Sequence, residues 1–185
     1  MENIKKIKYL HLLKHIFRDN DVLGKLETTA EHSRSCLILA DYFLNIMDLK
    51  VDKLRVYELL MYHDVVEIET WDIPMCNQEL RKNKKEIELK AMKKIRLEMP
   101  DILEEKYEKL FHEFEARETL ESKFANAIDK LDADIYAIDS SIESFKWYTE
   151  ELVRKKKQEP HYSQFPEIDE MFEKLLIWYK QRWVI

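Results

Sequence analysis

Glycine and proline are scarce in this chain. One glycine, Gly24, and four prolines occur among 185 residues, so few positions favour a turn or interrupt a helix. Long stretches rich in Leu, Glu and Lys, which are strong helix formers, occupy most of the remainder. The length suits one hydrophobic core. The sequence therefore predicts an all-α fold with little sheet, in a single domain over residues 1–185.

The chain also lacks the marks of several protein classes. Its formal net charge of −6 disfavours binding to polymeric nucleic acid, because such binding depends on neutralising many phosphates. No apolar run approaches membrane-spanning length, and the N-terminal segment is too charged for a signal peptide. Cys36 and Cys76, without a Cys-x-x-Cys motif, are typical of reduced thiols. We therefore expect a cytoplasmic protein with no membrane partner, and a small phosphate ester stays open as a ligand.

Apolar residues recur at helical spacing along most of the chain. Thr28 and Glu31 fit a capping box at the start of one helix, and Gly24 marks a loop over 19–27. A basic run at 154–157 is more typical of a solvated segment than of an anion site. The aromatic last helix is expected to pack on the core or to form a subunit contact. The predicted helices cover 4–18, 29–47, 52–69, 77–98, 102–116, 121–148 and 167–185.

Histidine and aspartate side chains fall on the inward faces of three of these helices. His32 opens the buried stripe of the second helix, Asp64 lies on the stripe of the third beside His63, and the 121–148 helix carries Asp129 and Asp132. Each residue alone is more typical of a hydrogen-bonded core group. Together they point to a cation, because a buried carboxylate is costly unless a positive group lies against it. Two imidazoles and two carboxylates suit one divalent ion such as Mn²⁺, Co²⁺, Fe²⁺ or Zn²⁺.

Four segments match a known family in order and spacing. The chain resembles the HD-domain metal-dependent phosphohydrolases over about residues 5–150, and most closely their 5′-deoxynucleotidase branch. The resemblance implies an HD-domain helical bundle with a single metal site between helices, held by His32, His63, Asp64 and Asp129. Helical periodicity favours Asp132 instead of Asp129, so Asp132 is kept as a reserve ligand or as a partner of a ligand. The matching segments are Ala30-Glu31-His32-Ser33, His63-Asp64-Val65-Val66-Glu67 through Asp72-Ile73-Pro74, Phe114-Glu115 and Ile128-Asp129-Lys130-Leu131.

The same resemblance implies hydrolysis of a (deoxy)ribonucleoside 5′-monophosphate to nucleoside and phosphate. By position, Glu67 corresponds to the acid/base residue beside the attacking water, and Asp72 to the carboxylate that faces the sugar hydroxyl. Arg18 corresponds to a phosphate-binding arginine, and Lys130 is expected to offset charge on the phosphoryl oxygens. A homodimer is a family expectation. Trp71 stands where the family has glycine, which leaves the base and sugar preference open.

Three other functions stay open from the sequence. The chain could hydrolyse a different phosphate ester, such as a nucleoside triphosphate or an alarmone. It could be a non-catalytic, metal-stabilised binding module, which Glu67 and Asp72 disfavour because metal binding alone needs neither. It could be a helical interaction protein with coincidental histidines. A site with two metal ions is disfavoured, because His112 is the one histidine between the His-Asp pair and the final aspartate.

Overall fold

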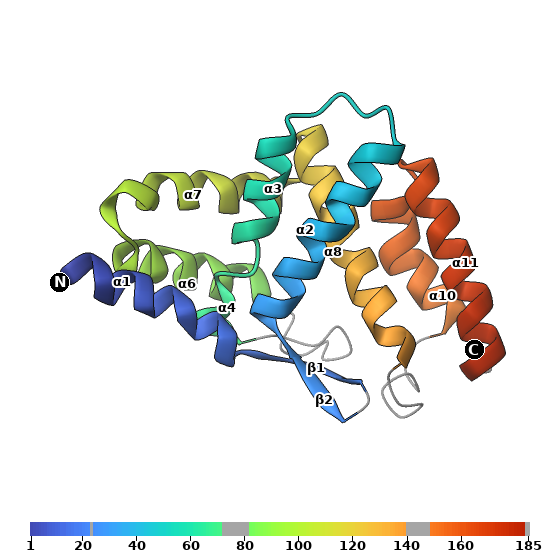
Figure 1. Ribbon diagram of the computed structural model, residues 1–185, viewed down its shortest axis with the longest axis horizontal. Coiled ribbons are helices and arrows are strands. Elements are labelled where there is room, and N and C mark those ends of the chain that lie inside the picture. The colour runs from blue at the N-terminus through green and yellow to red at the C-terminus, as the bar shows by residue number, and fades with distance from the viewer. Residues whose placement is uncertain (23, 72–81, 140–148, 184–185) are drawn as a thin grey trace.

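Helices make up most of the structure, and one antiparallel hairpin of two strands lies beside them (Figure 1). The computed structural model describes residues 1–22, 24–71, 82–139 and 149–183. The all-α prediction is confirmed in its main feature. The elements are α1 (Glu2–Leu10), η1 (His11–His15), β1 (Phe17–Val22), β2 (Lys25–Thr28), α2 (Thr29–Ile46), α3 (Lys53–Tyr62), α4 (Glu67–Thr70), α6 (Lys84–Glu98), α7 (Asp101–Ala116), α8 (Leu120–Tyr136), η2 (Ala137–Asp139), α10 (Glu150–Val153), η3 (Arg154–Tyr162) and α11 (Pro166–Trp183).

The N-terminal region differs from the prediction. A helix over 4–18 and a loop over 19–27 were expected, but the helical segment ends at His15 and a hairpin follows. Phe17 pairs with Thr28 across the two strands, and Gly24 takes a φ of +78° in the connecting turn. Such a φ is readily adopted by glycine alone, which explains why the single glycine lies here. The hairpin brings β1 and β2 beside the start of α2.

The predicted capping box at the start of α2 is confirmed. The Thr28 side chain accepts a hydrogen bond from the backbone N–H of Glu31 at 3.2 Å, and the Glu31 carboxylate accepts one from the N–H of Thr28 at 2.9 Å. Because the helix begins at this point, His32 lies in its first turn. Its face also buries Cys36, Ala40 and Phe43, which carries the imidazole into the protein interior.

The predicted helix over 52–69 is interrupted. α3 ends at Tyr62 and α4 begins at Glu67, with i→i+3 backbone hydrogen bonds from Val65 to Tyr62 and from Glu67 to Asp64 in between. This tight segment carries His63 and Asp64. The predicted helix over 121–148 ends at Tyr136 as α8, and residues 140–148 lie outside the described part, as do 77–81 of another predicted helix.

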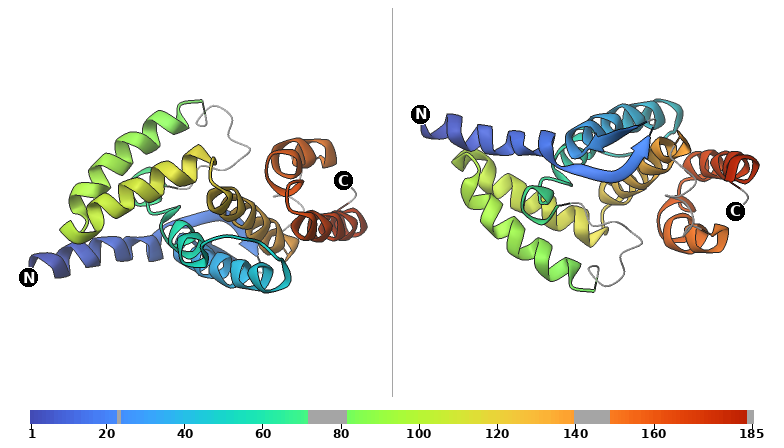
Figure 2. Two further views of the ribbon diagram at one scale, coloured as in Figure 1. Left: turned by 90° about the horizontal axis from the view of Figure 1, so that it is seen from above. Right: turned by 90° about the horizontal axis from the view of Figure 1, so that it is seen from below.

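α8 lies at the centre of the bundle (Figures 1 and 2). It packs against α2, α3, α7 and α11, and its residues are buried on several faces. One core cluster joins α2, α3, α8 and α11, and a second joins α4, α6 and α7. The last helix packs into the first cluster through Ile168, Phe172 and Leu176. None of the helices in the described residues is sufficiently long and apolar to cross a bilayer.

Candidate metal centre

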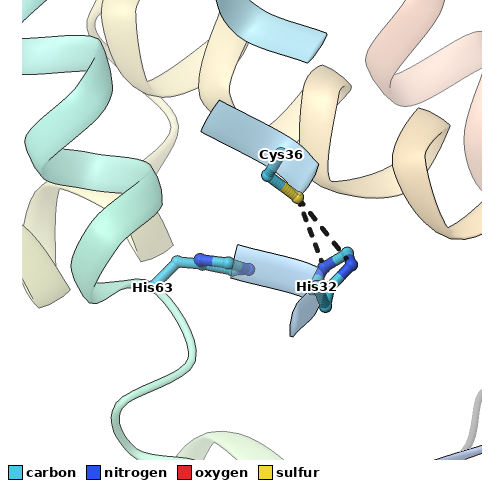
Figure 3. A group of neighbouring side chains, drawn as sticks. All are labelled: His32, Cys36 and His63. Atoms are coloured by element: carbon cyan, nitrogen blue, oxygen red, sulfur yellow. Dashed lines mark hydrogen bonds between the residues drawn. The ribbon is translucent and has the colours of Figure 1, made fainter. Parts of the chain in front are cut away.

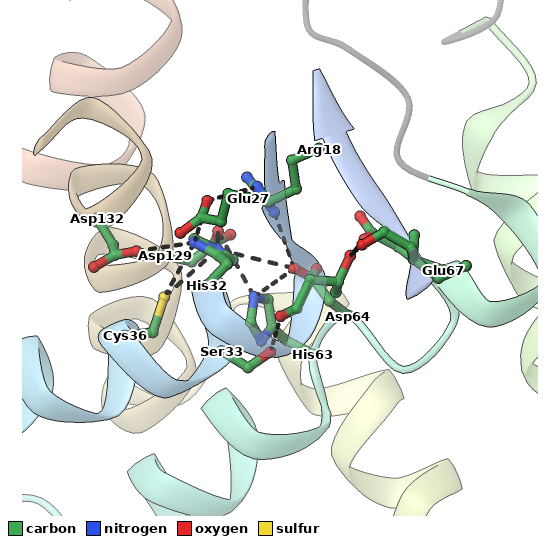
Figure 4. A network of polar contacts seen from close by, with 12 residues as sticks. Arg18, Glu27, His32, Ser33, Cys36, His63, Asp64, Glu67, Asp129 and Asp132 are labelled. Atoms are coloured by element: carbon green, nitrogen blue, oxygen red, sulfur yellow. Dashed lines mark hydrogen bonds and ion pairs between the residues drawn. The ribbon is translucent and has the colours of Figure 1, made fainter. Parts of the chain in front are cut away.

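Four donor atoms from three elements converge beneath the hairpin (Figure 4). His32 Nε2 on α2 lies 3.1 Å from Asp129 Oδ1 on α8 and 3.9 Å from Asp64 Oδ2. His63 Nε2 lies 3.0 Å from Asp64 Oδ2 and 3.8 Å from Asp129 Oδ1. Ligand atoms bound to one ion at about 2.1 Å lie roughly 3–4 Å from each other. The four predicted metal ligands therefore meet at one point, at separations that fit a single ion.

The hydrogen bonds of His63 indicate that a cation belongs between these groups. Its Nδ1 lies 2.8 Å from the carbonyl oxygen of Leu60, so Nδ1 carries a hydrogen and donates it. Nε2 is then left with a lone pair in the neutral ring, and it makes no hydrogen bond although it is buried. That lone pair faces carboxylate oxygens of Asp64 and Asp129. Such an arrangement is repulsive unless a positive charge lies between the groups.

His32 is held in the same way as His63, but the partner of its Nδ1 is a side chain and not a backbone carbonyl. Its Nδ1 lies 2.9 Å from Asp132 Oδ2, and Nε2 faces Asp129. Burial and the Arg18 charge oppose protonation, yet contacts with Asp129 and Asp132 hold the pKa of His32 well above its usual value. Without an ion, a proton on Nε2 supplies the positive charge. Asp132 therefore orients the ring from its far side, whereas Asp129 lies on the side of the donor cluster.

Both candidate carboxylate ligands are ionised. Burial alone would raise the pKa of Asp64, but positive charge at the His63 ring, where a metal ion would otherwise supply it, and the Arg18 guanidinium hold it below its usual range. Burial would likewise raise the pKa of Asp129, but the Lys130 ammonium and a hydrogen bond from His32 hold it well below its usual range. Ionised carboxylates and imidazole lone pairs are the donors that a borderline divalent ion requires. The residues present therefore fit a divalent metal.

Two other groups of side chains, which differ from the predicted set, also have ligand atoms close enough to share an ion. His32, Cys36 and His63 form one, and Glu27, His32 and Asp132 form the other, with ligand atoms within 4.8 Å of each other. Figure 3 shows Cys36 Sγ beside the ring of His32, 3.5 Å from Nε2. Burial raises the pKa of Cys36 to about 12, so in the absence of an ion this group is a protonated thiol, whereas the metal-binding form is the thiolate. In the second group, Nδ1 of His32 is hydrogen-bonded directly to Asp132, so this nitrogen is engaged by another member of the group and not free for an ion.

Arg18 and Lys130, which the resemblance assigned to the phosphate, border the donor cluster, and their role towards a phosphate stays a prediction. Arg18 Nη1 lies 3.2 Å from Asp64 Oδ2, and its Nε lies 3.5 Å from Glu27 Oε2. Lys130 forms an ion pair with Asp129. Both cations therefore contact candidate metal ligands or their neighbours, where they stabilise the ionised carboxylates.

The two predicted catalytic carboxylates have different outcomes. Glu67 is buried at the start of α4, and its Oε2 accepts a hydrogen bond of 2.8 Å from the hydroxyl of Thr29 on α2. Thr29 also contacts the carbonyl oxygen of Ile16, so the Glu67 carboxylate is held by the junction of β2 and α2. Asp72, assigned to the sugar contact, lies outside the described residues.

A cavity of about 820 Å³ opens onto the donor cluster and is lined by His63, Asp64 and Asp129. Pockets of about 300–1,000 Å³ are typical of small-molecule sites. Phe114 and Pro160 give the cavity apolar surface, and lysines from several elements give it a basic wall. The cavity can therefore admit a small organic anion to the candidate metal site.

Glu27 and His161 were not predicted as site residues, and Cys36 was expected to be an ordinary thiol. Glu27 is buried because β2 turns its side chain towards Arg18, and Gly24 between two short segments was the available hairpin signal. His161 lines the cavity from η3, about 30 residues beyond the last matching motif, and no local pattern marked it.

Comparison with known proteins gives a family match over most of the chain. Residues 10–169 match a family model described as HD domain. The curated 5′-deoxynucleotidase HDDC2 of Bos taurus is 26% identical over 113 residues, which are 61% of this chain. That match spans only 54% of the bovine protein, about half its length.

Solved structures share the fold along nearly the whole chain. A predicted metal-dependent phosphohydrolase from Magnetospirillum magnetotacticum MS-1 superposes with a TM-score of 0.75 at 24% identity, covering 96% of this chain and 92% of that one. An HD-domain phosphohydrolase from Listeria innocua gives a TM-score of 0.63 at 23% identity, with coverages of 95% and 84%. The family match covers most of the chain, and the donor cluster lies within it: this chain belongs to the HD domain family.

Proposed function

We propose that the chain is a metal-dependent phosphomonoester hydrolase that converts (deoxy)ribonucleoside 5′-monophosphates to nucleoside and phosphate. The observation that carries the proposal is the pair of imidazole Nε2 atoms that face two ionised carboxylates beside an open cavity. The bovine relative, a 5′-deoxynucleotidase, supports the choice of substrate. His32, His63, Asp64 and Asp129 would hold the ion. When bound, the ion would polarise a phosphoryl oxygen and acidify a water molecule.

The protein side chains would perform the remaining work. Glu67 would accept the proton of the attacking water, and the hydroxyl of Thr29 would keep its carboxylate oriented. Arg18 and Lys130 would stabilise the negative charge that grows on the phosphoryl oxygens. Asp72 would accept a hydrogen bond from the sugar hydroxyl. The apolar surface of Phe114 would contact the nucleoside.

The proposal is tested by phosphate release. The purified protein is stripped with a chelator, reloaded with Mn²⁺, Co²⁺, Fe²⁺ or Zn²⁺ in turn, and supplied with ribo- and deoxyribonucleoside 5′-monophosphates. We expect release with at least one ion. Glu67→Gln should retain the metal and lose about 10²–10⁴-fold in turnover, since that is the usual contribution of general acid–base catalysis.

Glu69→Gln is the matched control on the same helix. The Glu69 carboxylate is bound by Tyr9 and Lys94 on the outer side of α4, so this variant should keep its turnover. Normal turnover in Glu67→Gln would remove Glu67 from the mechanism. No release with any ion would favour the non-catalytic module, and release confined to nucleoside triphosphates or alarmones would favour the other esters.

A further inference from the structure

The cavity beside the candidate metal centre is far more basic than the chain as a whole. Eight Lys or Arg residues line it against four Asp or Glu residues, although the chain carries a net charge of −6. Two of those carboxylates, Asp64 and Asp129, belong to the donor cluster. A cleft lined by one sign of charge concentrates its electric field and attracts ligands of the opposite sign.

Some of these cations already have structural partners. Lys157 is buried and paired with Asp134, Lys84 pairs with Glu88, and Lys130 pairs with Asp129. Lys155, Lys156 and Arg117 also line the cavity, yet they form no ion pair with any residue that the structure describes. These three residues, here called the basic rim, are therefore available to a ligand.

The basic rim comes from two elements that both line the cavity. Lys155 and Lys156 lie on η3, which winds as a π-helix, a rare geometry that occurs frequently at functional sites. Arg117 ends α7 with a φ of +52°, a conformation in which glycine is favoured. Figure 2 shows α7 on one side of α8 and the segment of η3 on the other.

The positive charge of the cavity also acts on His161, which lines its wall. Burial, together with the charges of Lys130 and Arg117, lowers the pKa of His161 to about 4. His161 is therefore neutral near pH 7. It adds a hydrogen-bonding group to the wall without adding charge.

The amount of positive charge exceeds what one phosphate group requires. A phosphomonoester carries about −1.5 to −2 near pH 7. A divalent ion, Arg18 and Lys130 would already match that charge at the donor cluster. The basic rim, contributed by other elements, then has no role towards a single phosphate. It matches a second anionic group on the same ligand.

We propose that the basic rim is a second phosphate subsite, and that the preferred substrate is a nucleotide with a phosphate group in addition to the scissile one. This inference rests on the proposed function. For a nucleoside 3′,5′-bisphosphate, the water oxygen bonds to the 5′-phosphorus and the P–O5′ bond breaks. The O5′ oxygen receives a proton, and the products are nucleoside 3′-phosphate and inorganic phosphate.

Three substrates with one base separate the sources of the second phosphate. They are a deoxynucleoside 5′-monophosphate, the corresponding 3′,5′-bisphosphate and the corresponding 5′-diphosphate. We expect the KM of at least one doubly phosphorylated substrate to be about tenfold below that of the monophosphate, because charge-assisted hydrogen bonds to phosphate are strong. Whichever doubly phosphorylated substrate has the lower KM shows whether the second phosphate is carried on the 3′ oxygen or on the 5′-phosphate.

The double variant Lys155→Gln/Lys156→Gln removes two charges of the rim. We expect it to abolish most of this difference while changing kcat/KM for the monophosphate by less than about twofold, since the rim lies apart from the donor cluster. Lys5→Gln/Lys8→Gln is the matched control. It removes the same charge from exposed positions of α1, which does not line the cavity, and should retain the preference.

Equal KM values for all three substrates in the wild-type protein would overturn the inference, even if phosphate release from monophosphates upheld the proposed function. An equal loss of kcat/KM for the monophosphate and the bisphosphate in the rim variant would also overturn the inference. Calorimetric titration of metal-loaded Glu67→Gln with the bisphosphate and the monophosphate gives a readout independent of turnover. Tighter binding of the bisphosphate there, lost in the rim variant, would support the subsite even if no phosphate were released.

Discussion

At the scale of single residues, the two aspartates of α8 illustrate how position along one helix separates two roles. Asp129 and Asp132 are one turn apart, and each contacts a different nitrogen of the same imidazole. Asp132 also accepts a hydrogen bond of 2.7 Å from Ser35. Partners of this kind fix the tautomer and the orientation of a metal-binding histidine.

These two positions give a direct prediction. Asp129→Asn should lose stoichiometric metal, because it removes an ionised donor from the cluster. Asp132→Asn should still bind metal with about 10–100-fold lower affinity, because the Asn carbonyl can accept from His32 Nδ1. Elemental analysis after gel filtration and competition with a chelating dye measure both. The reverse order, with metal lost only in Asp132→Asn, would make Asp132 the ligand and Asp129 its support.

At the scale of secondary-structure elements, the end of α4 contains a costly backbone conformation. Trp71 has φ +60° and ψ 166°, a combination adopted almost only by glycine. Its side chain is 62% exposed, so little burial offsets the strain. In the family that the motif resembles, this position is a glycine, the residue that adopts this backbone conformation without strain.

Relief of this strain is testable by substitution. Trp71→Gly should raise the free energy of unfolding, since a residue in this region costs about 1–3 kcal/mol and the added flexibility of glycine costs about 0.5–1 kcal/mol. Trp71→Ala is the control, because alanine removes the ring and keeps the Cβ that causes the strain. Chemical denaturation measures both variants. An equal rise in the free energy of unfolding for Trp71→Ala and Trp71→Gly would show that loss of the indole ring, and not relief of backbone strain, causes the effect.

The break between α3 and α4 carries two of the donors. Adjacent residues diverge by about 100° on an α-helix and by about 120° where i→i+3 bonds give three residues per turn, and His63 keeps helical dihedral angles (φ −56°, ψ −43°). The two side chains nevertheless bring His63 Nε2 and Asp64 Oδ2 to 3.0 Å. Periodicity predicted the helix as continuous, because the apolar stripe continues through the break in Val65, Val66 and Ile68.

At the scale of the whole molecule, the donor cluster joins elements that are distant in sequence. α2, the α3–α4 segment and α8 each contribute donors, so an ion bound there would hold the three together. Binding to the folded state alone raises stability by about 2.7 kcal/mol when the free ion is at 100 times its Kd.

The homodimer expected from the resemblance stays a prediction.

Thermal unfolding therefore should depend on the ion present. After chelation, Mn²⁺ or Co²⁺ at about 100 times the Kd should raise Tm by roughly 5–10 °C for a chain of this size. Ca²⁺ is the matched control, because it prefers oxygen donors and the cluster contributes two imidazoles. Differential scanning calorimetry measures the shift. Equal increases in Tm with Ca²⁺ and Mn²⁺ would mean that carboxylate oxygens alone bind the ion and that the two imidazoles do not take part.

Local sequence was sufficient for the helical class and the capping box before His32, because helix formation and capping depend on neighbours a few positions away. It also placed His32 and Asp64 on inward-facing helical stripes, whereas the choice of Asp129 came from the family resemblance. It was insufficient for the hairpin, the break after Tyr62 and the contrast between Asp129 and Asp132. Those features depend on backbone pairing and packing between distant segments. The same reason applies to the run at 154–157. Its lysines resemble an ordinary solvated stretch in the sequence, and the fold makes them line the same cavity as Arg117.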